Sequence, residues 1–347
     1  MFHPTVSPHD PATILVACDM TGAYITHNGG KSWRMFNLRG VVRFFAFDPM
    51  NTKTIYAGAT GLWRSIDAGA TWSLVWPKAS NVTGIQMNSD HADETIVSNA
   101  NQLGRMEALA IDPHASRTLV AGTSNGVYRS DDAGESWKKL AALSEPAMHV
   151  WILDKAVYTA TAHGIMVNGR TNRGPVSTTF TDVSAGGTAF YAVANTGAWV
   201  SRNAGETWEE VVLPGTGAQI RAVATSLHHP ETAYVSYNHL KLDGQTWSGV
   251  ARTRDFGRSW TLVWKESKTA SANIHDAWIA PALGPGWGEN PLALGVADQD
   301  PNLCIGTDFG RTMITTDGGK NWNAAYSRRV PGGAWTTTGL DVTTSYG

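Results

Sequence analysis

The chain has few charged residues, only two cysteines and no long apolar run, and each shortage excludes a class of protein. Charged residues make up 16% of its 347 residues, against ~25% in an average domain, which argues against a helix-rich chain with many Glu, Lys and Arg. Cys18 and Cys304 are too few for a disulfide framework. No apolar run reaches the ~18–20 residues of a membrane span. A net charge of −2 gives no general reason to expect nucleic acid or another polyanion as a partner.

What the chain does contain is glycine and tryptophan, with 36 and 15 residues. Together with Thr and Ser they favour short strands joined by many turns. The N-terminal residues lack the basic start and apolar stretch of a signal peptide. We therefore expect either a secreted or periplasmic protein whose leader is absent from this sequence, or an intracellular protein.

One eight-residue pattern, Ser/Thr-x-Asp/Asn-x-Gly-x-x-Trp, recurs six times. Its copies occupy residues 26–33, 65–72, 130–137, 201–208, 253–260 and 315–322. The pattern predicts a β-hairpin, because Asp or Asn caps its own turn and Gly accepts a positive φ. We expect the Trp to begin the next strand and to pack inward.

The spacing of these boxes predicts the fold. Each box follows two short apolar strands and a first strand that ends in Asp-Pro, as at 44–49 and 108–113, which makes four strands per repeat. Residues 149–167 form a seventh unit without a box, and residues 77–103 form a polar insertion. The sequence therefore predicts an all-β fold, a single seven-bladed β-propeller of four-stranded antiparallel blades. The expected blades are residues 1–37, 40–77, 104–140, 145–183, 185–213, 219–264 and 292–327.

Function is expected where the repeats differ, since the scaffold explains what they share. In the turn between the second and third strands, most blades have small neutral residues, whereas Asp19 and Asp308 each lie seven residues before a box. Their blades are the first and the last, hence neighbours in a closed ring. Two carboxylates on one face are what the cleavage of a glycosidic bond requires. The alternative is that both Asp residues cap their own turns.

The boxes resemble those of the Asp-box (BNR-repeat) β-propellers, which include sialidases, two-propeller xyloglucanases, sortilin-type receptors and a photosystem assembly factor. Residues 18–24, Cys-Asp-Met-Thr-Gly-Ala-Tyr, are similar to the xyloglucanase segment Thr-Asp-x-Gly-Gly-Ala-Tyr, with Thr21 in place of one Gly. The resemblance implies that Asp19 is a catalytic carboxylate. In that family the second carboxylate comes from a second propeller, in a turn that Asp308 resembles. The likeness to sialidases is weaker, because Met1-Phe2-His3-Pro4 lacks the Arg of their early motif.

Further candidates for substrate binding lie near inner-strand starts and in two inserts. Insert 77–103 and insert 266–291 both join a fourth strand to the next first strand, so we expect both to form walls of a cleft on the ligand face. Loop Trp residues stack well on sugar rings, although they also anchor loops. The expected substrate-binding residues are Arg43, Arg105, Glu107, His149, His163, His275, Asp276, Trp278, Trp287 and Trp335. No metal-ligand spacing is present, so we expect no metal and no cofactor.

These observations predict a carbohydrate-active enzyme, a glycoside hydrolase acting on a plant or microbial polysaccharide with Asp19 and Asp308 as acid and base. One alternative is a non-catalytic carbohydrate- or protein-binding propeller. Another is a sialidase-like exo-enzyme or a polysaccharide lyase, with His149 or His163 as the base. The expected partners are an oligo- or polysaccharide and a second propeller. Residues 337–347 are either a latch strand or the start of that propeller.

Overall fold

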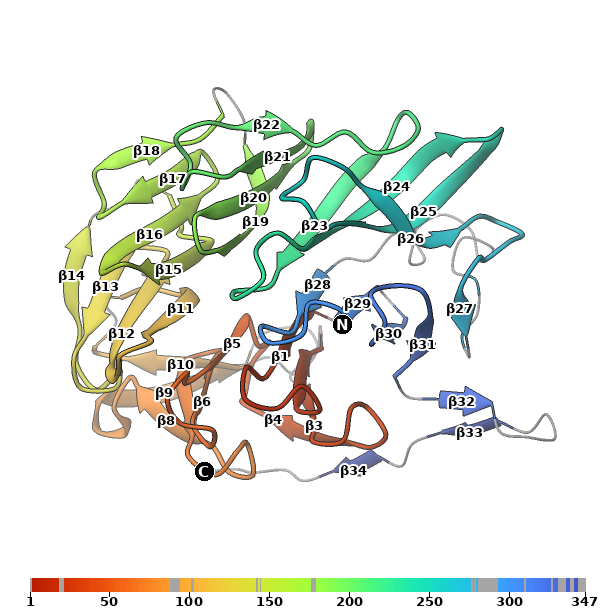
Figure 1. Cartoon of the computed structure of the whole chain (residues 1–347). Coiled ribbons are helices and arrows are strands. Elements are labelled where there is room, and N and C mark those ends of the chain that lie inside the picture. The colour runs from red at the N-terminus through yellow and green to blue at the C-terminus, as the bar shows by residue number, and fades with distance from the viewer. Residues whose placement is uncertain are drawn as a thin grey trace. The chain divides into compact units, whose positions relative to one another are not determined.

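The computed structural model describes residues 2–18, 22–87, 94–100, 103–141, 143, 145–175, 179–275, 277, 279, 293–308, 310–325, 327–329, 335–337 and 340–342. The chain is an all-β seven-bladed β-propeller of mostly four-stranded antiparallel blades (Figure 1). The predicted fold class is therefore confirmed. The internal contacts divide the chain into two compact units. Unit 1 comprises Met1–Ile14, Thr26–Trp33 and Gly174–Leu340, and unit 2 comprises Leu15–Ile25, Arg34–Arg173 and Asp341–Gly347.

The strands of blade 1 are divided between the two units, and β34 follows β4 at the edge of this sheet. They are β1 (Phe2–Val6), β2 (Ile14–Ala17), β3 (Gly22–Thr26), β4 (Trp33–Asn37) and β34 (Leu340–Val342).

Unit 2 holds blades 2, 3 and 4 and an additional hairpin after blade 2. Blade 2 is β5 (Phe44–Phe47), β6 (Ile55–Gly58), β7 (Leu62–Ser65) and β8 (Ser73–Trp76), followed by the 3-10 helix η1 (Ala79–Asn81) and the hairpin β9 (Val82–Met87) and β10 (Glu94–Ser98). Blade 3 is β11 (Met106–Asp112), β12 (Ala115–Thr123), β13 (Gly126–Ser130) and β14 (Lys138–Ala141), and blade 4 is β15 (His149–Leu153), β16 (Ala156–Thr161), β17 (Gly164–Val167) and β18 (Thr171–Arg173).

Unit 1 holds blades 5, 6 and 7. Blade 5 is β19 (Phe180–Gly186), β20 (Ala189–Ala194), β21 (Gly197–Ser201) and β22 (Glu209–Glu210), and blade 6 is β23 (Gln219–Thr225), β24 (Ala233–Leu242), β25 (Gln245–Thr253) and β26 (Thr261–Glu266). Blade 7 is β28 (Ala293–Val296), β29 (Cys304–Thr307), β30 (Thr312–Thr315) and β31 (Trp322–Ala324), with β27 (Ile274–His275) at its edge and the hairpin β32 (Ser327–Arg329) and β33 (Trp335–Thr337) after it.

The start of blade 5 differs from the boundary expected near residue 184. Strand β19 pairs with β20 through Phe180↔Ala194 and Gly186↔Ala189, so it belongs to blade 5. The sequence did not show where blade 4 ends and blade 5 begins, because blade 4 has no box to mark the end of its hairpins.

The six boxes fold as the capped turns that their sequence predicts. In blade 2 the Thr71 amide donates to Asp67 Oδ1 at 2.9 Å and the Gly69 amide donates to Ser65 Oγ at 2.7 Å. All six box glycines have positive φ, Gly69 among them at 86°. The residue before each box Gly also has positive φ, including Ala68 at 60°, which the repeated pattern did not predict.

Apolar faces of neighbouring blades pack together within each unit. In unit 2, Phe44, Leu62 and Val75 of blade 2 form one buried cluster with Met106 and Leu119 of blade 3. In unit 1, a comparable cluster joins blades 6 and 7 around Trp264 and Trp322, whose rings lie 5.0 Å apart. These neighbouring blades therefore remove their apolar side chains from water against one another, as a repeat architecture requires. Among the residues described, no helix has the length and apolar character needed to cross a bilayer.

Candidate functional site

Unit 2 contains a cleft of about 340 Å³ at the end of blades 2 and 3 where their inner strands begin. The antiparallel order of each blade brings the start of β5, the turn from β6 to β7 and the end of β8 to this one end. The residues that line the cleft come from blade 2, the insert and the start of blade 3; they are Gly40, Val41, Arg43, Ala59, Thr60, Gly61, Leu62, Trp76, Pro77, Glu94, Thr95, Ile96, Ser98, Ala100, Gly104, Arg105 and Met106.

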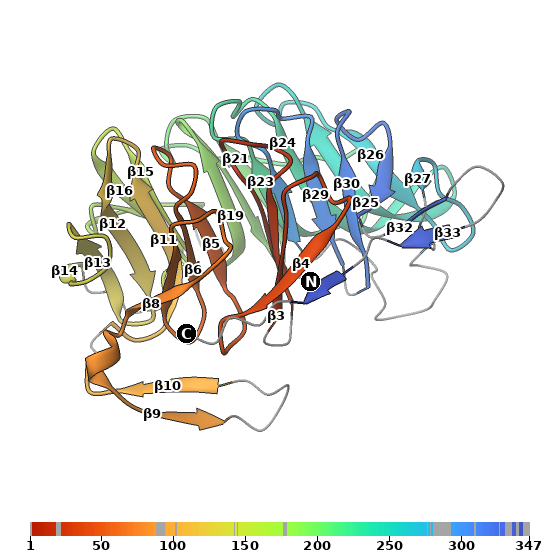
Figure 2. The same ribbon diagram turned by 90° about the horizontal axis from the view of Figure 1, so that it is seen from below.

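One wall of the cleft is the hairpin β9–β10, which extends beyond the blade ends in unit 2 (Figure 2). Three contacts attach β10 to blade 2 and the loop before it. Glu94 donates its amide hydrogen to the Arg39 carbonyl at 2.9 Å, and the two side chains form an ion pair at 2.7 Å. The Ile96 amide donates to Thr60 Oγ1 at 2.7 Å. Residues of insert 77–103 thus line a cleft, as expected, and the binding of a ligand there stays a prediction.

Two of the expected substrate-binding residues, Arg43 and Arg105, line this cleft, and a third, Glu107, forms ion pairs with both. Arg43 precedes β5, where its amide donates to the Gly58 carbonyl at 2.7 Å. Arg105 precedes β11, and Glu107 lies in that strand. The Glu107 carboxylate is 3.6 Å from Arg43 Nη1 and 2.5 Å from Arg105 Nε. The Glu107 side chain is 14% exposed, whereas those of Arg43 and Arg105 are 39% and 55% exposed. Both guanidinium groups therefore remain accessible to a ligand.

Trp76, Thr60 and Glu94 also line the cleft, and our list of expected site residues omitted them. A signal for Trp76 was present, because it lies outside all six boxes and directly precedes Pro77, where the insert begins. No comparable signal distinguishes Thr60, since a hydroxyl in a tight turn is common.

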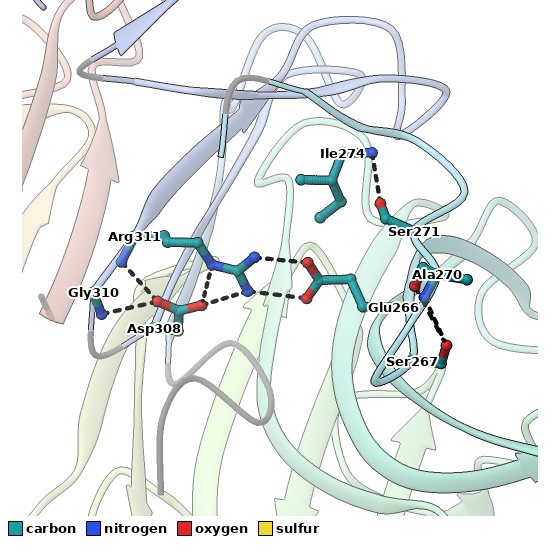
Figure 3. A network of polar contacts seen from close by, with 8 residues as sticks. All are labelled: Glu266, Ser267, Ala270, Ser271, Ile274, Asp308, Gly310 and Arg311. Carbon is teal, nitrogen blue, oxygen red and sulfur yellow. Dashed lines mark hydrogen bonds and ion pairs between the residues drawn. The ribbon is translucent and has the colours of Figure 1, made fainter. Parts of the chain in front are cut away.

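Asp308 lies in a buried ionic network in unit 1 (Figure 3). Its Oδ1 accepts the amide hydrogens of Gly310 at 3.0 Å and Arg311 at 2.7 Å, and its Oδ2 accepts Arg311 Nε–H at 2.7 Å. The other end of the guanidinium donates to both oxygens of Glu266, at 2.7 and 3.0 Å. Burial opposes the charge on Arg311, but the Glu266 and Asp308 carboxylates outweigh burial and raise the pKa of the guanidinium.

This geometry matches the turn-capping alternative for Asp308. The Asp308, Arg311 and Glu266 residues are each about 1% exposed, and the guanidinium carbon of Arg311 lies 5.3 Å from the ring centre of Trp264. A carboxylate that is buried and bound to an Arg in this way has no contact with solvent through which it could reach a substrate. The arrangement therefore gives no support to the expected role of Asp308 as an acid or base.

Four of the expected site residues lie outside the described residues, namely Asp19, Asp276, Trp278 and Trp287. Trp335 is described only by its backbone, in β33. The pairing of Asp19 with Asp308 stays a prediction.

The expected histidines lie at separate places. In unit 2, the His149 ring stacks on Trp151 with centroids 5.8 Å apart, and His163 Nδ1 is 2.6 Å from Glu145 Oε2. In unit 1, His275 Nε2 is 3.0 Å from Asn321 Oδ1 in the box of blade 7.

Strand β27, which contains His275, runs parallel to the outer strand β31. This places His275 at the end of blade 7 opposite the Asp308 turn, because β30 connects that turn to the box. Residues 273–275 of the second insert thus follow the outer edge of blade 7, whereas residues 267–272 turn back onto the end of β26. Within the described part of the chain, no group of three His, Cys, Asp or Glu side chains could hold a metal ion.

No protein-family model matches the chain. Curated proteins named xyloglucanase do match it. One from Paenibacillus sp is 24% identical over 91% of this chain and 33% of its own length. Another, from Hypocrea jecorina (strain QM6a), is 26% identical over 75% of this chain and 32% of its own length. The chain is distantly similar to xyloglucanases. It spans about a third of the length of these relatives. The weaker resemblance to sialidases gains no support.

Solved structures support the fold. A GH74 xyloglucanase from Xanthomonas campestris has a TM-score of 0.67 and 18% identity over 93% of this chain and 54% of its own. An ancestral GH74 enzyme has a TM-score of 0.65 and 16% identity over 96% of this chain and 48% of its own. YCF48 with a bound D1 peptide has a TM-score of 0.54 and 13% identity over 92% of this chain and 87% of its own. This propeller scaffold thus occurs in proteins with different tasks.

Proposed function

We propose that the chain binds a polysaccharide in the cleft of unit 2 as part of a carbohydrate-active protein. The observation that carries the proposal is that this cleft combines an aromatic side chain, Trp76, with two exposed guanidinium groups, Arg43 and Arg105. Sugar rings present apolar faces that pack on an indole, and their hydroxyl groups accept hydrogen bonds from guanidinium groups. Xyloglucan is the first polysaccharide to test, because the curated relatives are named for it.

Electrophoresis in gels that contain a dissolved polysaccharide measures this binding directly. Xyloglucan, xylan and mixed-linkage glucan are compared with a gel that contains none. Trp76→Ala should abolish most of the retardation that the best polysaccharide causes. The matched control is Trp137→Ala, since both side chains pack against the same apolar cluster but only Trp76 lines the cleft. Equal retardation of Trp76→Ala and the unchanged protein would remove the cleft from the proposal.

Glycosidic bond hydrolysis is the second function that we propose, with Asp19 as acid or base. It is favoured by the distant similarity to xyloglucanases across 91% of this chain and by the segment around Asp19. A second propeller, which would account for the greater length of the relatives, belongs to the same proposal. Release of reducing ends from xyloglucan measures the reaction. Asp19→Asn should reduce it at least about a hundredfold, while leaving retardation in the gel unchanged.

Asp308 has a different role in this proposal. Its contacts with Arg311 suit a residue that holds the turn between β29 and β30. Asp308→Asn should therefore lower the stability of the protein more than its activity at a temperature where it stays folded. If Asp308→Asn instead abolishes hydrolysis without any loss of stability, the acid or base role returns to Asp308.

A further inference from the structure

The charges at the cleft of unit 2 are unequal, and their arrangement points to the chemistry of the ligand. Two guanidinium groups and one carboxylate line the cleft, from Arg43, Arg105 and Glu94. The opposing charges, on Glu107 and Arg39, belong to residues that do not line it. The five groups together carry one excess positive charge.

Each carboxylate of this group already has a guanidinium partner. Glu94 pairs with Arg39 at 2.7 Å, so its charge is balanced from outside the lining. Glu107 forms ion pairs with both Arg43 and Arg105, and its contact with Arg43 is long, at 3.6 Å. A guanidinium group has five N–H donors in a planar fork. One shared carboxylate with four lone-pair positions leaves most of the ten donors of this pair for a ligand or water.

We infer that the cleft prefers a polysaccharide that carries carboxylate groups, as uronic acid residues do, and that Arg43 and Arg105 bind one such carboxylate. A guanidinium fork matches the two oxygens of a carboxylate, and such charge-assisted bonds are about twice as strong as neutral ones. This inference rests on the proposed polysaccharide binding and specifies the ligand within it.

The charge of the whole chain does not supply this preference. With a net charge of −2, the protein has no general attraction for polyanions. A preference for acidic chains would therefore originate locally, at a cleft whose half-exposed Arg side chains lie beside apolar lining residues such as Leu62 and Met106. Such surroundings screen an ion pair less than open water does.

The test compares pairs of polysaccharides that differ in their carboxylate groups. One pair is polygalacturonate and highly methyl-esterified pectin, and the other is glucuronoxylan and the same xylan after chemical reduction of its carboxyl groups. Gel retardation and calorimetry at ~50 mM and ~500 mM NaCl measure the affinity for each. We expect the acidic member of at least one pair to bind about tenfold or more tightly at the lower salt concentration, with the difference decreasing at the higher one.

The variants Arg43→Gln and Arg105→Gln locate the preference. Each should reduce the affinity for the acidic polysaccharide about tenfold, the effect of losing a charge-assisted contact, and leave the affinity for the neutral member unchanged. The control is Arg129→Gln, which removes a half-exposed Arg of the same unit that pairs with Asp131 outside the cleft. Tryptophan fluorescence and near-UV circular dichroism check that each variant is folded.

The outcomes separate this inference from the proposed function. If a neutral polysaccharide such as xyloglucan binds, and neither acidic member is preferred, the inference is wrong and the proposed function stands. If the acidic member is preferred but Arg43→Gln and Arg105→Gln bind it as the control does, the carboxylate is bound elsewhere and the inference is again wrong. If no polysaccharide binds, both proposals are wrong.

Discussion

Replacement of Arg311 by Met tests whether the ionic network of unit 1 is as buried as its geometry indicates. The guanidinium donates to Asp308 and Glu266 at 2.7–3.0 Å, and all three residues are about 1% exposed. Arg311→Met keeps much of the side-chain volume but leaves two carboxylates without their partner. Breaking a buried ion pair from one side costs about 3–5 kcal/mol. For a chain of 347 residues this corresponds to a decrease in Tm of about 4–7 °C.

The assay is urea unfolding followed by Trp fluorescence at pH 7. Without Arg311, the carboxylates of Asp308 and Glu266 share a buried site with no counter-charge, which should lower the free energy of unfolding. We attribute this loss to the two carboxylate charges that Arg311→Met leaves without a partner. The triple variant Glu266→Gln, Asp308→Asn, Arg311→Met removes both charges, so its free energy of unfolding should lie within about 2 kcal/mol of that of the unchanged protein.

The control for this experiment is Arg129→Met, which breaks the exposed pair with Asp131 and should cost no more than about 1 kcal/mol. The reasoning would be refuted if Arg311→Met cost no more than this control. It would also be refuted if the triple variant were no more stable than Arg311→Met.

Two further predictions concern the turns and the close packing of strands. The hydrogen bond from the Ser259 hydroxyl, aided by other donors and opposed by partial desolvation, lowers the pKa of Asp255 to about 2, so its contribution to stability is present above about pH 4 and is lost as the pH falls toward 2. Asp255→Asn should therefore keep most of the stability at pH 7, because Asn203 accepts the corresponding hydrogen bonds in blade 5. Between pH 4 and pH 2 the variant should lose less free energy of unfolding than the unchanged protein, as measured by urea unfolding. Identical pH dependence of the two proteins would contradict this. Gly249→Ala should lower the free energy of unfolding by about 2–4 kcal/mol, because its Cβ would lie 1.9 Å from the Trp264 carbonyl oxygen at a φ of 151°; a loss below about 0.5 kcal/mol would show that the backbone relaxes there.

The sequence predicted the fold well because the information is repeated. Six boxes each carry a capping residue, a positive-φ glycine and a packing Trp, so an error at one box leaves the repeat count unchanged. The blade without a box was found from its strands alone, and insert 77–103 was correctly separated from the blades. The boundary between blades 4 and 5 was missed, because only a box marks where a hairpin ends.

The candidate site was predictable only in part. Arg43 and Arg105 could be predicted because each lies near the start of an inner strand, and the antiparallel topology brings such positions to one end of a unit. The burial of Asp308 could not be predicted, because its partner Arg311 also binds Glu266, which lies 45 residues earlier at the end of the preceding blade, and no local pattern indicates that contact. The position of His275 could not be predicted for a similar reason, since the partner of β27 is the distant strand β31. Its role in substrate binding stays a prediction.

The hairpin β9–β10, which forms one wall of the cleft, should open locally while the blades stay folded. Two strands alone are marginally stable in water, and Ile85, Met87 and Val97 of this hairpin are exposed. Its amide hydrogens should therefore exchange through a local opening of lower free energy than those of β11. The apparent affinity of the cleft is then the intrinsic affinity multiplied by the fraction of molecules with the wall closed. Arg39→Ala removes an ion pair that holds that wall. It should therefore weaken ligand binding although Arg39 does not line the cleft.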